Sequence, residues 1–192
     1  MSEMSDINYD ALWQRATAEF ALPPGSAHGP SHWKRVEQNG LKLAQKTVAR
    51  TDVVKLFAVF HDSKRQNEFN DPEPGPRGAA FVRELRGVLF QIDDEGMALL
   101  CEACSVHTAL HHSADATIGT CLDADRLDLG RVGIVPDPRF MSTAFGRELC
   151  VELSSSPSRP GSAIVMSIVI GRRIRLSATG FPTSASFIKK GY

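Results

Sequence analysis

The chain has 192 residues, of which 42% are hydrophobic and 23% charged, so it can bury one core of roughly 150 residues. Its formal net charge is zero, but all 22 acidic residues lie at or before Glu152, together with 16 of the 22 basic residues. This acidic body argues against general nucleic-acid binding, and the longest apolar run, at 163–171, is shorter than the roughly 20 residues that cross a bilayer.

Apolar residues recur at helical spacing over most of the first 130 positions. Residues 8–22 predict a helix that ends before Pro23-Pro24-Gly25. Residues 31–49 predict a second helix, with Ser31 as its N-cap, Val48 among its apolar positions and a local weakness at Gly40. A loop connects these two helices.

Residues 51–62, with the sequence TDVVKLFAVFHD, predict a central buried helix because their second half is uniformly apolar. Prolines and glycines then predict a loop over 63–78, and loops of this length in compact domains are often functional. Helices are expected again over 79–92, 93–110, 117–132 and 141–153. The predicted fold class is therefore all-α, a bundle of about six helices.

The pattern changes beyond Gly133, where residues 135–140 break the helix. Residues 154–162 read as a Ser/Pro-containing linker, and the β-branched stretch 163–176 could pair as a short hairpin in an otherwise irregular segment. The six basic residues after Glu152 all fall here. We therefore expect a helical domain over residues 1–150 and a basic, flexible tail over 151–192.

The central helix ends in an adjacent histidine and aspartate, His61 and Asp62. The pair could simply close the helix, with Asp62 capping the next segment, or it could bind a metal. A metal needs further imidazoles and carboxylates from other elements. His32 lies in the first turn of the second helix, and Asp125 lies among apolar residues in LDADRLDL, where a buried acid needs a partner.

These segments, HWKRV, LFAVFHD and DADRLD in that order on three predicted helices, resemble the ligand segments of the HD-domain superfamily of metal-dependent phosphohydrolases. The resemblance covers about residues 28–135. It implies an HD-like helical bundle with one divalent ion, such as Mn, Mg, Fe or another transition metal. The ligands that it implies are His32, His61, Asp62 and Asp125.

The resemblance also implies catalytic roles. Asp62 could accept a proton from attacking water, while Lys64 and Arg65, just after the pair, could hold phosphate oxygens, as could Arg126. A solvated helix end is the alternative for each of these cations. We expect His107 to line the pocket and to hydrogen-bond substrate or a metal ligand.

Other histidines and the cysteines are less informative. No histidine lies between Asp62 and His107, which argues against a second metal and against a two-iron oxygenase on this scaffold. The segment CEACSVH could suggest zinc, but it lies in a continuous helical pattern, so buried, reduced thiols are expected. The roles of His28, Glu68, His111 and His112 stay open.

The expected activity is hydrolysis of a phosphomonoester or phosphodiester in a nucleotide or another small phosphorylated metabolite. Relatives that hydrolyse the alarmone ppGpp carry an acidic pair after the HD dipeptide, whereas this chain has Lys64 and Arg65. The alternative is a helical binding or scaffolding module whose metal is structural or absent. The sequence shows no leader, so we expect a cytoplasmic protein, and a homodimer would fit the pairing of some relatives.

Overall fold

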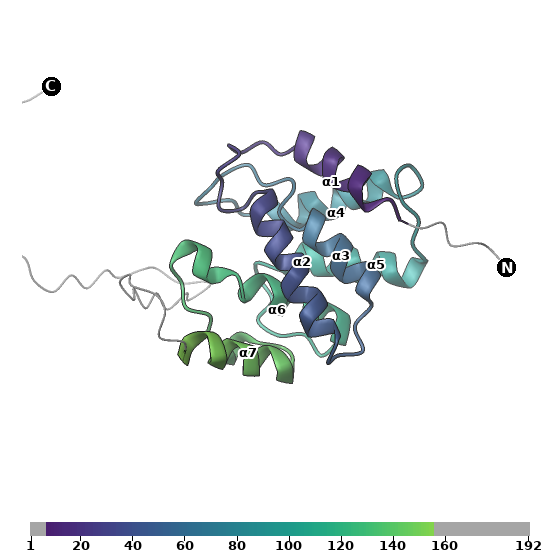
Figure 1. Cartoon of the computed structure of the whole chain (residues 1–192). Coiled ribbons are helices and arrows are strands. Elements are labelled where there is room, and N and C mark those ends of the chain that lie inside the picture. The colour runs from purple at the N-terminus through teal and green to yellow at the C-terminus, as the bar shows by residue number, and fades with distance from the viewer. Residues whose placement is uncertain (1–6, 156–192) are drawn as a thin grey trace, which may run out of the picture.

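The computed structural model describes residues 7–155, which form an all-helical fold (Figure 1). Its α-helices are α1 (Tyr9–Ala18), α2 (Pro30–Ala44), α3 (Thr51–Phe60), α4 (Pro74–Leu85), α5 (Asp94–Val106), α6 (Ala116–Arg126) and α7 (Ala144–Ser155). Two short 3-10 helices, η1 (Leu129–Val132) and η2 (Pro138–Phe140), connect α6 to α7. The all-α prediction is confirmed, whereas the predicted hairpin lies outside the described residues and the division at residue 150 stays a prediction.

Helix α3 is the centre of the bundle. It packs against α1, α2, α4, α5 and α6, and Figure 1 shows α1 and α4 above it and α6 and α7 below. Every residue from Leu56 to Phe60 is fully buried, as expected for a helix that is apolar on all sides. Because α3 ends inside the protein, the two residues after it, His61 and Asp62, are buried as well.

Helix α4 crosses the end of α3 at very short range. A Cβ atom at Gly78 would lie 2.4 Å from the carbonyl oxygen of Phe60 and 3.1 Å from that of His61, so only glycine fits here. The predicted loop over 63–78 is shorter than expected and ends at residue 73, since Pro74 occupies the first position of α4, where its missing N–H costs nothing.

Other predicted boundaries also shift. Gly29, not Ser31, is the N-cap of α2, because Pro30 already starts the helix. Helix α2 ends at Ala44, which leaves Val48 in the connection to α3 and 91% exposed. The predicted helix over 79–92 ends at Leu85, and Gly87 reverses the chain with a left-handed φ of 82°.

Hydrogen bonds that involve two residues of α6, Asp123 and Arg126, hold the segment between α6 and α7. The buried carboxylate of Asp123 accepts hydrogen bonds from the backbone N–H groups of Ser142 and Thr143 and from the Thr143 hydroxyl. Arg126, which the sequence offered as a phosphate ligand, donates instead to the backbone carbonyls of residues 110, 111 and 140. These bonds fix the chain on both sides of the last turn of α6.

The four cysteines are free and buried, which confirms that expectation. No helix within residues 7–155 combines the length and the hydropathy that a membrane crossing requires.

Gly78→Ala tests the close approach of α4 to α3. Because the nearest atoms are backbone carbonyls that cannot move independently, we expect the free energy of unfolding to fall by about 1–3 kcal/mol in urea denaturation. Gly25→Ala is the control, since no atom lies within 4 Å of a Cβ there, and it should change stability by less than about 0.5 kcal/mol. Equal stabilities of the two variants would show that α4 can shift away from α3.

Candidate metal centre

Four elements bring ionisable side chains to one buried point. His32 comes from the first turn of α2, His61 and Asp62 come directly after α3, and Asp125 lies in the last turn of α6. His107 joins them as the C-cap of α5. The side chains of His32 and His61 are fully buried and that of Asp62 is 3% exposed. Their nitrogen and oxygen atoms therefore depend on protein groups or a bound ion, rather than on solvent, for polar contacts.

Three of the four predicted metal ligands, His32, His61 and Asp62, lie within reach of one ion, and the fourth, Asp125, adjoins His32. The Nε2 atoms of His32 and His61 are 3.0 Å apart, and each lies 3.8 Å from Oδ2 of Asp62. Oδ1 of Asp125 lies 3.2 Å from His32 Nε2. Within residues 7–155, the group that could share a metal ion comprises His32, His61 and Asp62, with one ligand atom of each within 4.8 Å of the others.

The second ring nitrogen of each histidine identifies its tautomer. Nδ1 of His61 faces the carbonyl oxygens of Phe57 at 3.1 Å and Ala58 at 3.2 Å, and Nδ1 of His32 faces the Asp128 carboxylate at 2.7 Å. Since these neighbours can only accept hydrogen bonds, each Nδ1 must carry a proton. Both Nε2 lone pairs in the neutral rings therefore point into the same small space, which only a cation or a shared proton can stabilise.

Asp125 supplies an independent indication. Its Oδ1 is buried and has no hydrogen-bond donor within the described part of the chain, because the 3.2 Å contact with His32 Nε2 lacks hydrogen-bond geometry. Buried polar atoms rarely lack a partner, and an atom without one requires an explanation such as an ion. Two imidazoles and two carboxylates form a donor set that suits a divalent transition metal, so these residues fit the ion that the sequence predicted.

Asp62 is held as a carboxylate by neighbours on both oxygens. His28 Nδ1 lies 2.9 Å from Oδ2, while Arg65 Nη1 and His107 Nε2 lie 3.3 Å and 3.5 Å from Oδ1. Burial alone would raise the pKa of Asp62, but the hydrogen bonds from His107 and His28 outweigh it and hold the pKa well below its usual range. Asp62 therefore favours its ionised form, which is the form that ligates a metal.

The two facing histidines differ in proton affinity. Burial lowers the pKa of His61 to about 3. Burial acts in the same direction on His32, yet the carboxylates of Asp125 and Asp128 outweigh it and raise the pKa. In the metal-free chain, a proton on His32 Nε2 can thus be donated to His61 Nε2, and a metal ion would displace this proton.

Three arginines match the three aspartates of the site. Arg65 lies beside Asp62, Arg131 Nη1 lies 3.9 Å from Asp125 Oδ1, and Arg35 Nε lies 2.7 Å from Asp128 Oδ1. These six charges cancel when the histidines are neutral. A bound divalent cation would therefore leave an excess of about two positive charges, which favours an anionic ligand.

Lys64 points to a different part of the surface. Its ammonium group binds the carboxylate of Glu19 and lies 3.9 Å from the centre of the Phe81 ring. Together with Arg65 and Arg77, Lys64 lines a surface cavity of about 380 Å³ beside α4. Arg65 borders both this cavity and Asp62.

The remaining candidates have structural contacts. Glu68 accepts hydrogen bonds from Ser26 and from the backbone of Ala27 and so fixes the loop that carries His28. His111 packs edge-on against Phe140, and His112 contacts the carbonyl oxygen of Arg139.

Sequence reasoning missed two members of the cluster, His28 and Asp128. Asp128 lies three residues after Asp125, the spacing at which side chains share one helical face, so this signal was present. His28 lies in a Gly/Pro-rich loop where no periodicity predicts a direction. Only the packing of that loop against Asp62 identifies it.

Comparisons with known proteins support the fold. No family model and no curated protein matches the sequence. A solved structure from an uncultured Thermotogales bacterium, described as a predicted HD superfamily hydrolase, matches with a TM-score of 0.63 and 23% identity, over 76% of this chain and 84% of its own. The chain therefore has the HD-like helical fold that its sequence predicted.

The low pKa of His61 predicts a pH-dependent stability in the metal-free chain. Unfolded, His61 takes up a proton near pH 6.5, but in the folded chain it does so only near its pKa of about 3, so the unfolded state binds more protons between these values. The contribution of neutral His61 to the free energy of unfolding is fully present above pH 6.5. It falls by up to about 1.4 kcal/mol for each pH unit of acidification. The lowered pKa values of Asp62 and Asp125 reduce stability only below about pH 4.

Urea denaturation of the wild type and of His61→Gln at pH 6.5, 5.5 and 4.5 measures this effect. The raised pKa values of His32 and His107 act above pH 6.5 with the opposite sign, since their stabilisation is lost as the pH rises. The wild type should lose stability more steeply than the variant over this range. Parallel losses would contradict a neutral, buried His61.

Proposed function

We propose that this protein is a metal-dependent phosphohydrolase that acts on a phosphomonoester or phosphodiester of a nucleotide or another small phosphorylated metabolite. The observation that carries the proposal is the pair of buried imidazole nitrogens that face each other at 3.0 Å, beside an Asp125 oxygen that has no donor among residues 7–155. The fold shared with a protein described as a predicted HD superfamily hydrolase supports it.

His32, His61, Asp62 and Asp125 would hold one divalent ion. When bound, such an ion supplies Lewis acidity to a phosphoryl oxygen and lowers the pKa of water. Asp62 would take up a proton from the attacking water, because its neighbours keep it ionised and it lies beside the candidate ligands His32 and His61. His107, with Nε2 3.5 Å from Asp62 Oδ1, would orient that carboxylate.

Arg65 contacts the same oxygen of Asp62 as His107 does. Arg65 is nearly buried and is tied to Asp62 and to the carbonyl oxygen of Asn67. It would position the carboxylate and keep a positive charge beside the reacting phosphoryl group. Lys64 could contact the phosphoryl group only if its ion pair with Glu19 broke. We therefore assign Lys64 to the adjoining cavity rather than to the phosphoryl group.

Metal content tests the ligand assignment. We expect the wild type to bind one divalent ion per chain, and His32→Ala to weaken the affinity for manganese by at least ~10-fold, the scale reported even for groups that only support a ligand. His112→Ala is the matched control, because this exposed histidine contacts only a backbone carbonyl. Equilibrium dialysis with elemental analysis measures both, and unchanged affinity in His32→Ala would contradict the assignment.

A hydrolysis screen tests the activity. Nucleotides and small phosphate esters are incubated with the protein with and without manganese, and the product phosphate is measured. Asp62→Ala should abolish turnover with its circular dichroism spectrum retained, since it removes both a ligand and the proton acceptor. A wild type that holds no metal and turns over no substrate would favour the binding or scaffolding module instead, and two irons per chain would favour an oxygenase.

A further inference from the structure

We propose that Arg35 is the anion-binding residue beside the metal centre, and that Asp128 is a positioning residue that aims both Arg35 and the metal ligand His32. This inference rests on the proposed function and deepens it, because it names the residue that takes the anionic oxygens of the substrate. The three arginines of the site differ in how many of their donors are already used.

Two of the three arginines are nearly buried, and each already donates two hydrogen bonds to the protein. Arg65 donates through Nε to the carbonyl oxygen of Asn67 and through Nη1 to Asp62, and its side chain is 10% exposed. Arg131 donates through Nε to the carbonyl oxygen of Ala27 and through Nη1 to that of Asp128, and its side chain is 9% exposed. Both arginines therefore have a structural role, because they connect loops to the acidic residues of the cluster.

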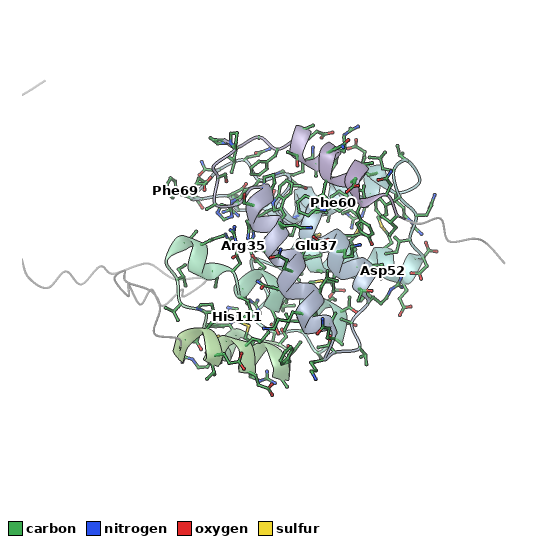
Figure 2. The ribbon with its side chains drawn as sticks, viewed as in Figure 1. Arg35, Glu37, Asp52, Phe60, Phe69 and His111 are labelled. Atoms are coloured by element: carbon green, nitrogen blue, oxygen red, sulfur yellow. The ribbon has the colours of Figure 1, made fainter. Side chains whose placement is uncertain are left out.

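Arg35 differs in exposure and in free donors. Its side chain is 43% exposed, and its hydrogen bond within the described residues is the one from Nε to Asp128 Oδ1 at 2.7 Å. Figure 2 shows Arg35 projecting from α2 toward the segment after α6. The Nη1/Nη2 edge of its guanidinium therefore remains available, and this planar fork matches two oxygens of a phosphate.

Asp128 connects this arginine to the metal centre. One carboxylate oxygen accepts from Arg35 Nε, and the other accepts from His32 Nδ1 at 2.7 Å. The same carboxylate thereby fixes the tautomer of His32 and the direction of Arg35.

The charge balance favours an anion at this position. Asp128 neutralises Arg35 in the metal-free chain, but a divalent ion held through His32 adds positive charge on the other side of the same carboxylate. A ligand with phosphoryl oxygens would restore the balance, and an exposed arginine whose Nε is already fixed loses little conformational entropy when it binds. The ligand class is therefore an anionic phosphoryl group, and a neutral ester would gain nothing from this residue.

Titration calorimetry with inorganic phosphate and with pyrophosphate, on the full chain loaded with manganese, tests the assignment without turnover. Arg35→Gln should weaken the binding of at least one of the two anions by roughly 10- to 100-fold, the range for a lost charged hydrogen bond. Its affinity for manganese should fall by less than that of Asp128→Asn, since Arg35 reaches the predicted ligand His32 only through the Asp128 carboxylate.

Lys34→Gln is the matched control. Lys34 is the neighbouring cation on α2, and it contacts Glu37 and the Trp13 ring rather than the cluster. Its removal changes the net charge by the same amount, so both anion affinities should stay within about twofold of the wild type at physiological salt. Equal losses in the two variants would mean that only long-range charge matters, and would overturn the proposal.

Asp128→Asn separates positioning from fold stability. It should weaken manganese binding by about 10-fold through His32 and weaken anion binding through Arg35. In the Arg35→Gln background, Asp128→Asn should have a smaller effect on anion affinity, whereas a merely structural role would give additive effects. Arg35→Lys should restore only part of the affinity, because an ammonium cannot hold Asp128 and present a fork to phosphate.

The outcomes for this inference and for the proposed function are distinguishable. Hydrolysis and metal binding by the wild type, with anion affinities unchanged in Arg35→Gln, would overturn the role of Arg35 and leave the phosphohydrolase standing. A wild type that binds neither anion in the presence of manganese would overturn the role of Arg35 whatever the hydrolysis screen gives.

Discussion

The structure depends on one electrostatic constraint, the approach of two fully buried imidazole nitrogens to 3.0 Å. Backbone carbonyls hold one ring and Asp128 holds the other, so neither can turn its lone pair away. Three distant segments must meet to build this arrangement, and the apolar helix α3 is what carries His61 and Asp62 to the meeting point. A protein that kept such a pair only for packing would gain more from two apolar side chains.

Charge neutrality explains how the chain tolerates this cluster. Each aspartate of the site has an arginine within 4 Å, and those arginines arrive from α2, from the turn after α3 and from η1. The acids therefore stay ionised without leaving a net buried charge, which would be costly. The aspartates are already neutralised by the arginines. The positive charge of a bound cation would therefore attract an anionic ligand rather than neutralise an unpaired acid.

The surrounding helices act as spacers for this chemistry. Gly78 lets α4 press against the end of α3, and Asp123 and Arg126 clasp the chain on either side of Asp125. The match to a predicted HD superfamily hydrolase extends over 76% of the chain at only 23% identity. The match therefore shows a shared helical framework.

The sequence by itself determined the all-α class and the buried central helix, and it named His32, His61 and Asp62, whose side chains meet in the cluster. Periodicity and the apolar run before His61 are local properties, so they can be read without coordinates. The helix ends were less accurate, because the prolines at residues 74 and 76 and Gly87 act through backbone geometry that propensity describes only on average. Only the tertiary structure decided that Lys64 turns to Glu19, that Arg126 serves the backbone, and that His28 and Asp128 join the site. These outcomes depend on which groups from distant segments lie within hydrogen-bond distance, and no spacing along a single chain specifies that distance.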